Sequence, residues 1–140
     1  MFSKQITTFL CCLFLGLLHA QEVEIKKDNI LLDGQPFLKY EKINLITFSI
    51  KDLKGEEVLF YQIKNNGTSD YSDDDYLSFN FVTMKKKIQT SSVGRIVALG
   101  TKNMIEKMLR WLLNDGVFRP DGSIDTEKLD LFAEKYNDIN

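Results

Sequence analysis

The sequence contains little cysteine, histidine or proline. The positions of the cysteines and the histidine limit which catalytic and metal-binding chemistries the chain can carry out. Of its 140 residues, two are cysteine, one is histidine and two are proline. Cys11, Cys12 and His19 all fall within the first 20 residues. From residue 21 onward there is no disulfide, no Cys or His nucleophile, and no zinc or copper site built on these side chains.

Residues 1–20 have the pattern of a cleaved signal peptide. Lys4 is the only charged residue, residues 9–18 are apolar or glycine throughout, and Ala20 precedes a polar stretch. A membrane span needs about 20 apolar residues, so a permanent anchor is not expected. We therefore expect residues 1–20 to be removed and residues 21–140 to form one domain that is periplasmic or secreted.

A lipid anchor at Cys11 or Cys12 is not expected, because the apolar run follows these cysteines instead of preceding them.

The absence of disulfides from the expected domain bears on its source. A domain of this length buries enough surface to fold without cross-links. Since small secreted eukaryotic domains commonly depend on disulfides, a disulfide-free exported chain indicates a bacterial source.

The charge balance gives no sign of a nucleic-acid partner. Residues 21–140 hold 17 Lys and Arg and 20 Asp and Glu, because Lys4 is the only charged residue before them. A net negative chain lacks the basic field that attracts phosphate backbones. The one dense basic run, Lys85–Lys87, is interpreted as a solvated turn or strand end.

Residues 22–88 have the two-residue alternation of strands joined by short turns. Asp33-Gly34 lies between apolar runs and predicts a hairpin, because both residues tolerate positive φ. The alternation over residues 76–84 predicts one strand. Residues 58–63 are apolar on both faces except at Gln62, which predicts a central strand covered on both sides.

After residue 90 the apolar period becomes that of a helix. Ser91 or Ser92 is a plausible N-cap, a break is expected near Gly100, and Gly116 suits the helix end. Asp125 is expected to cap a last helix. The first helix shows an apolar stripe of Val93, Ile96, Val97, Met104, Met108, Trp111 and Leu112, and the last one shares a face of Leu129, Phe132, Ala133 and Tyr136.

The predicted fold class is α+β. An antiparallel meander sheet of five or six strands comes first, because short strands with short turns pair with their sequence neighbours. A C-terminal helical hairpin then packs its apolar stripe on one face of the sheet. Under this prediction Trp111 and the methionines of the stripe belong to the core.

Several segments could hold a ligand, but their residues are better explained by structural roles. The acidic run Asp70–Asp75 could hold a cation, but it matches no ligand template and reads as a solvated loop. Residues 121–125 resemble half of an EF-hand, yet Val117, Arg119 and Lys128 stand where ligands are required. The segment Ser91–Arg95 could begin a phosphate-binding helix but lacks the glycine pattern, and the sequon Asn66-Gly67-Thr68 is expected to be bare. No catalytic, cofactor-binding or metal-binding residue is predicted.

The tyrosines are the remaining candidates. Tyr71 and Tyr76 flank the acidic run, and aromatic rings beside carboxylates can line a carbohydrate- or peptide-binding surface. Tyr40 and Tyr61 would join them only if the fold brings all four together.

The run from Val23 to Glu41, which contains Ile-Leu-Leu-Asp-Gly-Gln-Pro-Phe-Leu-Lys-Tyr-Glu, resembles small exported bacterial proteins of unknown function. The C-terminal part is similar to theirs too, with a helix, an Asp-Gly turn and a closing helix that ends in Phe-Ala-Glu-Lys-Tyr. The resemblance covers most of residues 22–137 and rests on turn and packing residues. It implies no activity, and no functional residue is carried over.

The leading hypothesis is a non-enzymatic binding module of the cell envelope, whose partner is another protein or an envelope polymer. It predicts a contiguous exposed apolar or aromatic patch. The alternative is a small-ligand or cation carrier that uses the loop of residues 65–75. A hydrolase that works with carboxylates alone ranks last, because it needs two of them held at a fixed separation in a cleft.

Overall fold

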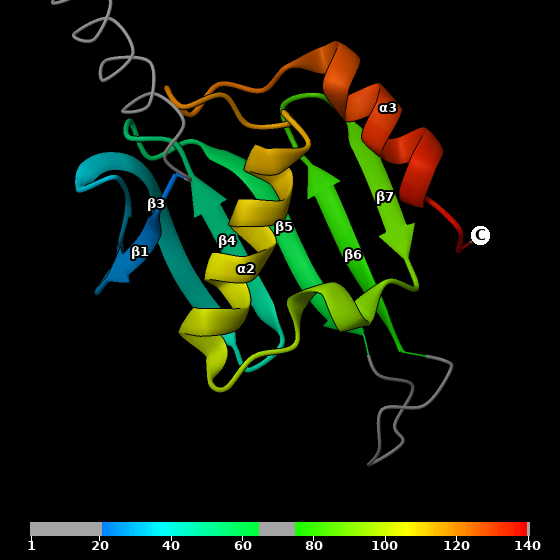
Figure 1. Ribbon diagram of the computed structural model, residues 1–140, viewed down its shortest axis with the longest axis horizontal. Coiled ribbons are helices and arrows are strands. Elements are labelled where there is room, and N and C mark those ends of the chain that lie inside the picture. The colour runs from blue at the N-terminus through cyan, green and yellow to red at the C-terminus, as the bar shows by residue number, and fades with distance from the viewer. Residues whose placement is uncertain (1–20, 65–74, 140) are drawn as a thin grey trace, which may run out of the picture.

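The computed structural model describes residues 21–64 and 75–139, which form an α+β architecture (Figure 1). Seven antiparallel strands make one sheet in which every strand pairs with its sequence neighbours. Two helices follow, so the predicted meander with a C-terminal helix pair is confirmed. The strands are β1 (Val23–Lys26), β2 (Asn29–Leu32), β3 (Gln35–Asn44), β4 (Thr47–Lys51), β5 (Glu57–Lys64), β6 (Tyr76–Phe81) and β7 (Lys86–Thr90); η1 (Val93–Ile96) is a 3₁₀ turn, and the helices are α2 (Thr101–Asn114) and α3 (Thr126–Tyr136).

The prediction of five or six strands is wrong because the sequence hides one turn. β6 ends at Phe81, the chain turns over residues 82–85, and β7 returns beside it. Lys85 adopts a positive φ of 52°, which a lysine rarely does, so composition gives no turn signal there. The Lys85–Lys87 run is a turn and a strand start, as interpreted, and Lys86 Nζ lies 2.9 Å from Asp130 Oδ1.

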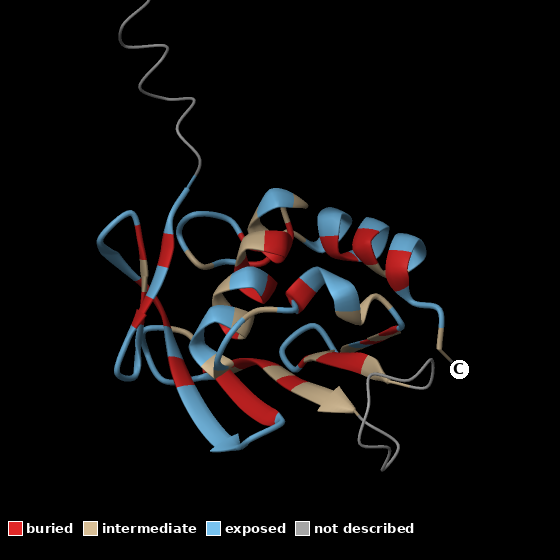
Figure 2. Cartoon of the chain, turned by 60° about the horizontal axis from the view of Figure 1, so that its bottom comes forward, coloured by how far each residue is buried: buried red, intermediate tan, exposed pale blue. Residues whose placement is uncertain are grey.

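Both helices lie on one face of the sheet (Figures 1 and 2). There they cover a row of aromatic side chains. Phe48, Tyr61 and Phe79 are directly opposite one another on β4, β5 and β6, and each is fully buried. Their ring centroids are 6.0 and 5.0 Å apart. Phe79 then meets Trp111 of α2 at 5.8 Å and Phe132 of α3 at 5.7 Å. Trp111 therefore belongs to the core, as predicted.

The opposite face of the sheet is polar, and the prediction of an apolar covering on both sides is wrong. One cross-strand row there is Thr47, Gln62, Ser78 and Gln89, and the next is Ser49, Phe60, Asn80 and Lys87. Val58 and Phe60 made β5 read as apolar on both faces, but Phe60 stands in the second of these polar rows. Its neighbours on β4 and β6 are hydroxyl and amide residues, which a one-strand view does not reveal.

The helical stripe is interrupted near Gly100, as predicted. Gly100 has a φ of 85° and α2 begins at Thr101, while the residues before it form only the short turn η1. Ser92 occupies the predicted N-cap position, but before the short turn η1 and without a side-chain capping bond. Ser91 Oγ donates to Asp138 Oδ2 at 2.5 Å.

The ends of the helices follow their predicted chemistry. Gly116 has a φ of 78°, and Val117 N donates to Leu112 O at 2.8 Å, which closes α2. Asp125 caps α3 by accepting from Lys128 N at 3.1 Å. The turn at Asp33-Gly34 is also confirmed, with φ values of 50° and 81°.

Both edges of the sheet are protected by contacts with other segments. Beyond α3, the backbone N–H of Asp138 donates to Gln89 O at 3.1 Å, so the C-terminal segment lies along β7. At the other edge the sheet curves until β1 contacts α2, and Ile25 N donates to Glu106 Oε1 at 3.1 Å. Covered edges do not recruit strands of other chains. In the described ranges, no helix has the length and apolarity that crossing a bilayer requires.

The aromatic row predicts the largest single loss of stability in the molecule. Replacing Phe79 with Ala removes a ring that contacts both helices, and we expect the free energy of unfolding to fall by about 3–5 kcal/mol. Leu131→Ala, on the exposed side of α3, is the control and should cost under about 0.5 kcal/mol. Urea unfolding monitored by circular dichroism measures both, and comparable losses would contradict this account of the core.

Candidate ligand pocket

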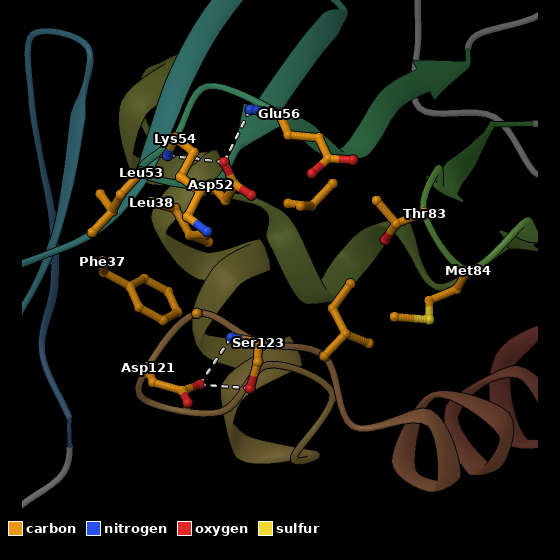
Figure 3. A pocket seen from close by; sticks show the side chains of 13 residues that line it. Phe37, Leu38, Asp52, Leu53, Lys54, Glu56, Thr83, Met84, Asp121 and Ser123 are labelled. Atoms are coloured by element: carbon orange, nitrogen blue, oxygen red, sulfur yellow. Dashed lines mark hydrogen bonds between the residues drawn. The ribbon is translucent and has the colours of Figure 1, made fainter.

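A pocket of about 440 Å³ opens at the end of the sheet where three turns meet (Figure 3). Its walls come from the start of β3 (residues 37–38), the β4–β5 turn with the first residues of β5 (52–58), the β6–β7 turn (83–84), and the segment that joins α2 to α3 (121–124). We call it the turn pocket. Its volume lies within the range of about 300–1,000 Å³ typical of small-molecule sites.

The turn pocket has an apolar floor and a partly apolar rim. Phe37, Leu38, Val58 and Ile124 line it and are at most 9% exposed. Leu53 stands at its edge 49% exposed, and Met84 stands there 39% exposed. Two exposed apolar side chains beside one pocket with an apolar floor offer contact area to a ligand.

One wall is fixed by the side chain of Asp52. Its Oδ1 accepts from Lys54 N at 3.0 Å and from Glu56 N at 2.9 Å, and its own N–H donates to Glu56 O at 2.8 Å. These bonds hold the β4–β5 turn in one shape. Oδ2 of Asp52 receives no hydrogen bond from the residues that the structure describes.

The facing wall is fixed in the same way by Asp121. Its Oδ1 accepts from Ser123 N at 2.9 Å and from Ser123 Oγ at 2.6 Å. The Ser123 side-chain and backbone hydrogen bonds, in that order, lower the pKa of the Asp121 carboxyl, so it stays ionised at neutral pH. Figure 3 shows Asp52 and Asp121 on opposite sides of the pocket.

The charged residues of the lining give the turn pocket a net negative character. Asp52, Glu56 and Asp121 contribute carboxylates, and Lys54 is the only cation among the lining residues. Charges at the rim of an apolar pocket interact more strongly with a ligand, because apolar walls screen charges less than water does. The arrangement therefore favours a ligand that joins an apolar part to a positive charge.

Residues 121–125, which resemble half of an EF-hand, form a turn followed by the cap of α3. Asp121 bonds to Ser123, and Asp125 caps α3 and lies 3.4 Å from Arg119 Nη2. Across the two described ranges, no three His, Cys, Asp or Glu side chains are grouped as a metal site would require. The acidic run falls outside these ranges for residues 70–74, as does the sequon at residues 66–68.

The tyrosines do not form the surface that the sequence allowed. Tyr61 is fully buried in the aromatic row, and burial raises the pKa of its hydroxyl. Tyr40 is 8% exposed and stacks on Phe48 at 6.1 Å. Tyr76 is half-buried on β6, and Tyr71 lies outside the described residues.

A second, shallower hollow of about 270 Å³ lies beside α2 and is basic. Arg95, Lys107 and Arg110 line it around Trp111. The Arg95 guanidinium carbon is 5.2 Å from the Trp111 ring centroid and 4.9 Å from that of Tyr136. Arg110 pairs with Glu106 at 3.6 Å and Lys107 donates to Val97 O, so these two cations already have partners within the fold.

The remaining exposed apolar side chains lie elsewhere. Outside the turn pocket they occupy the β3–β4 turn, residue 82, the segment before α2, and the outer side of α3; they are Ile43, Leu45, Ile46, Val82, Val97, Leu99 and Leu131. The contiguous patch stays a prediction.

Sequence reasoning missed the turn pocket because its residues come from four separate segments. The segments 52–55 and 121–122 each hold one Asp and one Gly, which favour turns, but nothing in one sequence shows that they lie at the same pocket. Leu53, as a large apolar residue beside Asp52 and Gly55 in a turn, was the one local signal, since the turn at Met84 was not predicted.

The turn pocket depends on Gly122, which a matched substitution tests. Gly122 has a φ of 87°, and an added Cβ would lie 3.0 Å from Phe37 O. Gly34 has a similar φ of 81° in another Asp-Gly turn but with open space around it. Both Gly→Ala changes bear a strain of about 1–2 kcal/mol, and we expect Gly122→Ala to lower the free energy of unfolding further than Gly34→Ala. Equal losses in urea unfolding would mean that the 119–124 turn does not press on β3.

Comparison of the chain with protein-family models, with curated proteins and with solved structures finds no match. The pocket is therefore interpreted from its own residues.

Proposed function

We propose that this chain is an exported, non-enzymatic binding module that holds its partner at the turn pocket. The observation that carries the proposal is the pairing of a buried apolar floor with half-exposed Leu53 and Met84 at the rim. Such a site gains from burying these side chains against a partner, at roughly 25 cal/mol for each Å² removed from water.

The acid–base character of the pocket also favours binding. Asp121 is held ionised by Ser123, which suits ion pairing and not proton donation to a leaving group. Asp52 and Asp121 each use one carboxylate oxygen, Oδ1, to accept hydrogen bonds within their own turn. Rigid turns present a preformed surface, so less conformational entropy is lost when a partner docks.

Two residues of one turn provide the test of the site. Met84 and Val82 are both 39% exposed in the β6–β7 turn, but only Met84 lines the pocket. Immobilised chain is exposed to an envelope extract of its source, and retained species are quantified by mass spectrometry. We expect a species that wild type and Val82→Glu retain and that Met84→Glu loses by about tenfold or more, since a buried unpaired charge costs several kcal/mol. Retention of the same species by Met84→Glu would rule out the pocket as the binding site.

Export has its own test. Residues 1–20 carry the leader pattern, so intact-mass analysis of protein from the periplasm or medium should find a chain that begins at Gln21. Leu13→Lys places a charge within the apolar run and should leave the full-length chain in the cytosol. A wild-type chain that stays in the cytosol with residues 1–20 attached would contradict the proposal.

A further inference from the structure

We infer that the turn pocket takes a lysine side chain of a partner protein, with the apolar residues on either side of that lysine packed on Leu53 and on Met84, which lie at opposite sides of the pocket (Figure 3). This inference rests on the binding function proposed above and specifies its ligand. It follows from the charges of the rim, the apolarity of the floor and the exposure of the edge, taken in turn.

The net negative charge of the residues at the rim favours a cationic ligand. Three lining carboxylates, on Asp52, Glu56 and Asp121, stand against Lys54. Asp52 and Asp121 lie on opposite sides of the pocket (Figure 3), and each uses Oδ1 for its own turn. A cation in the pocket pairs with an oxygen of either carboxylate that the described residues leave free, and such a hydrogen bond is of the stronger, charge-assisted kind.

The floor calls for an aliphatic stem below that cation. Phe37, Leu38 and Val58 line the pocket and gain nothing from a compact hydrated ion. Lysine carries its ammonium on four methylene groups, which lie along apolar surface while the charge stays near water. One side chain thus satisfies the floor and the rim together.

The edge calls for a ligand that continues past the pocket. Leu53 and Met84 are 49% and 39% exposed, so a free amine held inside the pocket would leave much of both in water. A polypeptide with an apolar residue on each side of the lysine covers both of them as well. The occupant is therefore a protein segment and not a small amine.

Met84 supplies a direct readout in the purified chain. Beyond residue 20 the methionines are Met84, Met104 and Met108, and Met108 is fully buried in α2. With ¹³C-labelled methionine methyl groups, we titrate the acetylated and amidated pentapeptide Ala-Leu-Lys-Leu-Ala, the same peptide with glutamate or norleucine for lysine, and n-hexylammonium. The lysine peptide should shift the Met84 methyl signal in a saturable way and leave Met108 in place.

The variants remove charge and keep the turns. Asn at position 52 or 121 retains an oxygen in place of Oδ1, so the bonds to Lys54 N, Glu56 N and Ser123 N persist. Asp52→Asn with Asp121→Asn should weaken the lysine peptide about tenfold, at about two- to fivefold for each exposed pair. Asp33→Asn is the control, because Asp33 Oδ1 accepts from Glu22 N in a turn away from the pocket.

Each outcome decides a separate claim. The inference holds if the lysine peptide binds at least fivefold more tightly than the norleucine and glutamate peptides and than hexylammonium. Equal binding of the lysine and norleucine peptides overturns it while leaving the proposed pocket function intact. Binding of hexylammonium as tight as that of the lysine peptide makes the ligand a small amine and overturns the protein assignment. If no probe shifts Met84, the lysine inference is overturned, and the envelope-extract experiment decides separately whether the pocket binds anything else.

Discussion

The contact on which the rest of the structure depends is the meeting of Phe79 with the rings around it. Phe79 lies between Tyr61 and Ile88 in the sheet and touches Trp111 and Phe132 from two different helices. Full burial of a ring of this size contributes about 1.5–3 kcal/mol, and favourable ring pairs add about 0.5–1.5 kcal/mol each. Because α2 and α3 both pack on this one side chain, its position sets where each helix crosses the sheet.

The turn pocket follows from that placement. Once both helices are held over the sheet, the segment between them must pass over the ends of β3 and β6. Phe118 anchors it there, with its ring 6.1 Å from that of Phe37 and 6.4 Å from that of Phe81. Gly122 then lies against the β3 backbone, where a Cβ would come within 3.0 Å of Phe37 O. The pocket wall is thus a consequence of core packing and not an independent loop.

The turns and helix ends whose geometry depends on one or two residues were predicted correctly from the sequence. Gly116 ends α2, Asp125 begins α3 and Asp33-Gly34 turns the first hairpin, since each requires only its own backbone geometry and near neighbours. The turn at Lys85 escaped prediction because packing forces a lysine into positive φ. The polar face of the sheet and the turn pocket escaped it for another reason. Both are defined by residues on neighbouring strands or distant turns, and pairing register is invisible in a single sequence.

Asp52 and Asp121 show how one residue type serves folding and recognition together. In each, Oδ1 accepts backbone N–H groups that the turn would otherwise leave without partners, so the turn selects Asp or Asn for its own stability. That requirement places a side chain with an acceptor oxygen at the rim, and Asn also supplies such an oxygen, although its hydrogen bonds lack the charge that strengthens those of Asp121. The choice of Asp at both positions also places two negative charges beside an apolar floor, more than the turns need for their backbone bonds. A cation in the pocket is attracted by both charges, so the charge of these residues points to a ligand while their shape points to the fold.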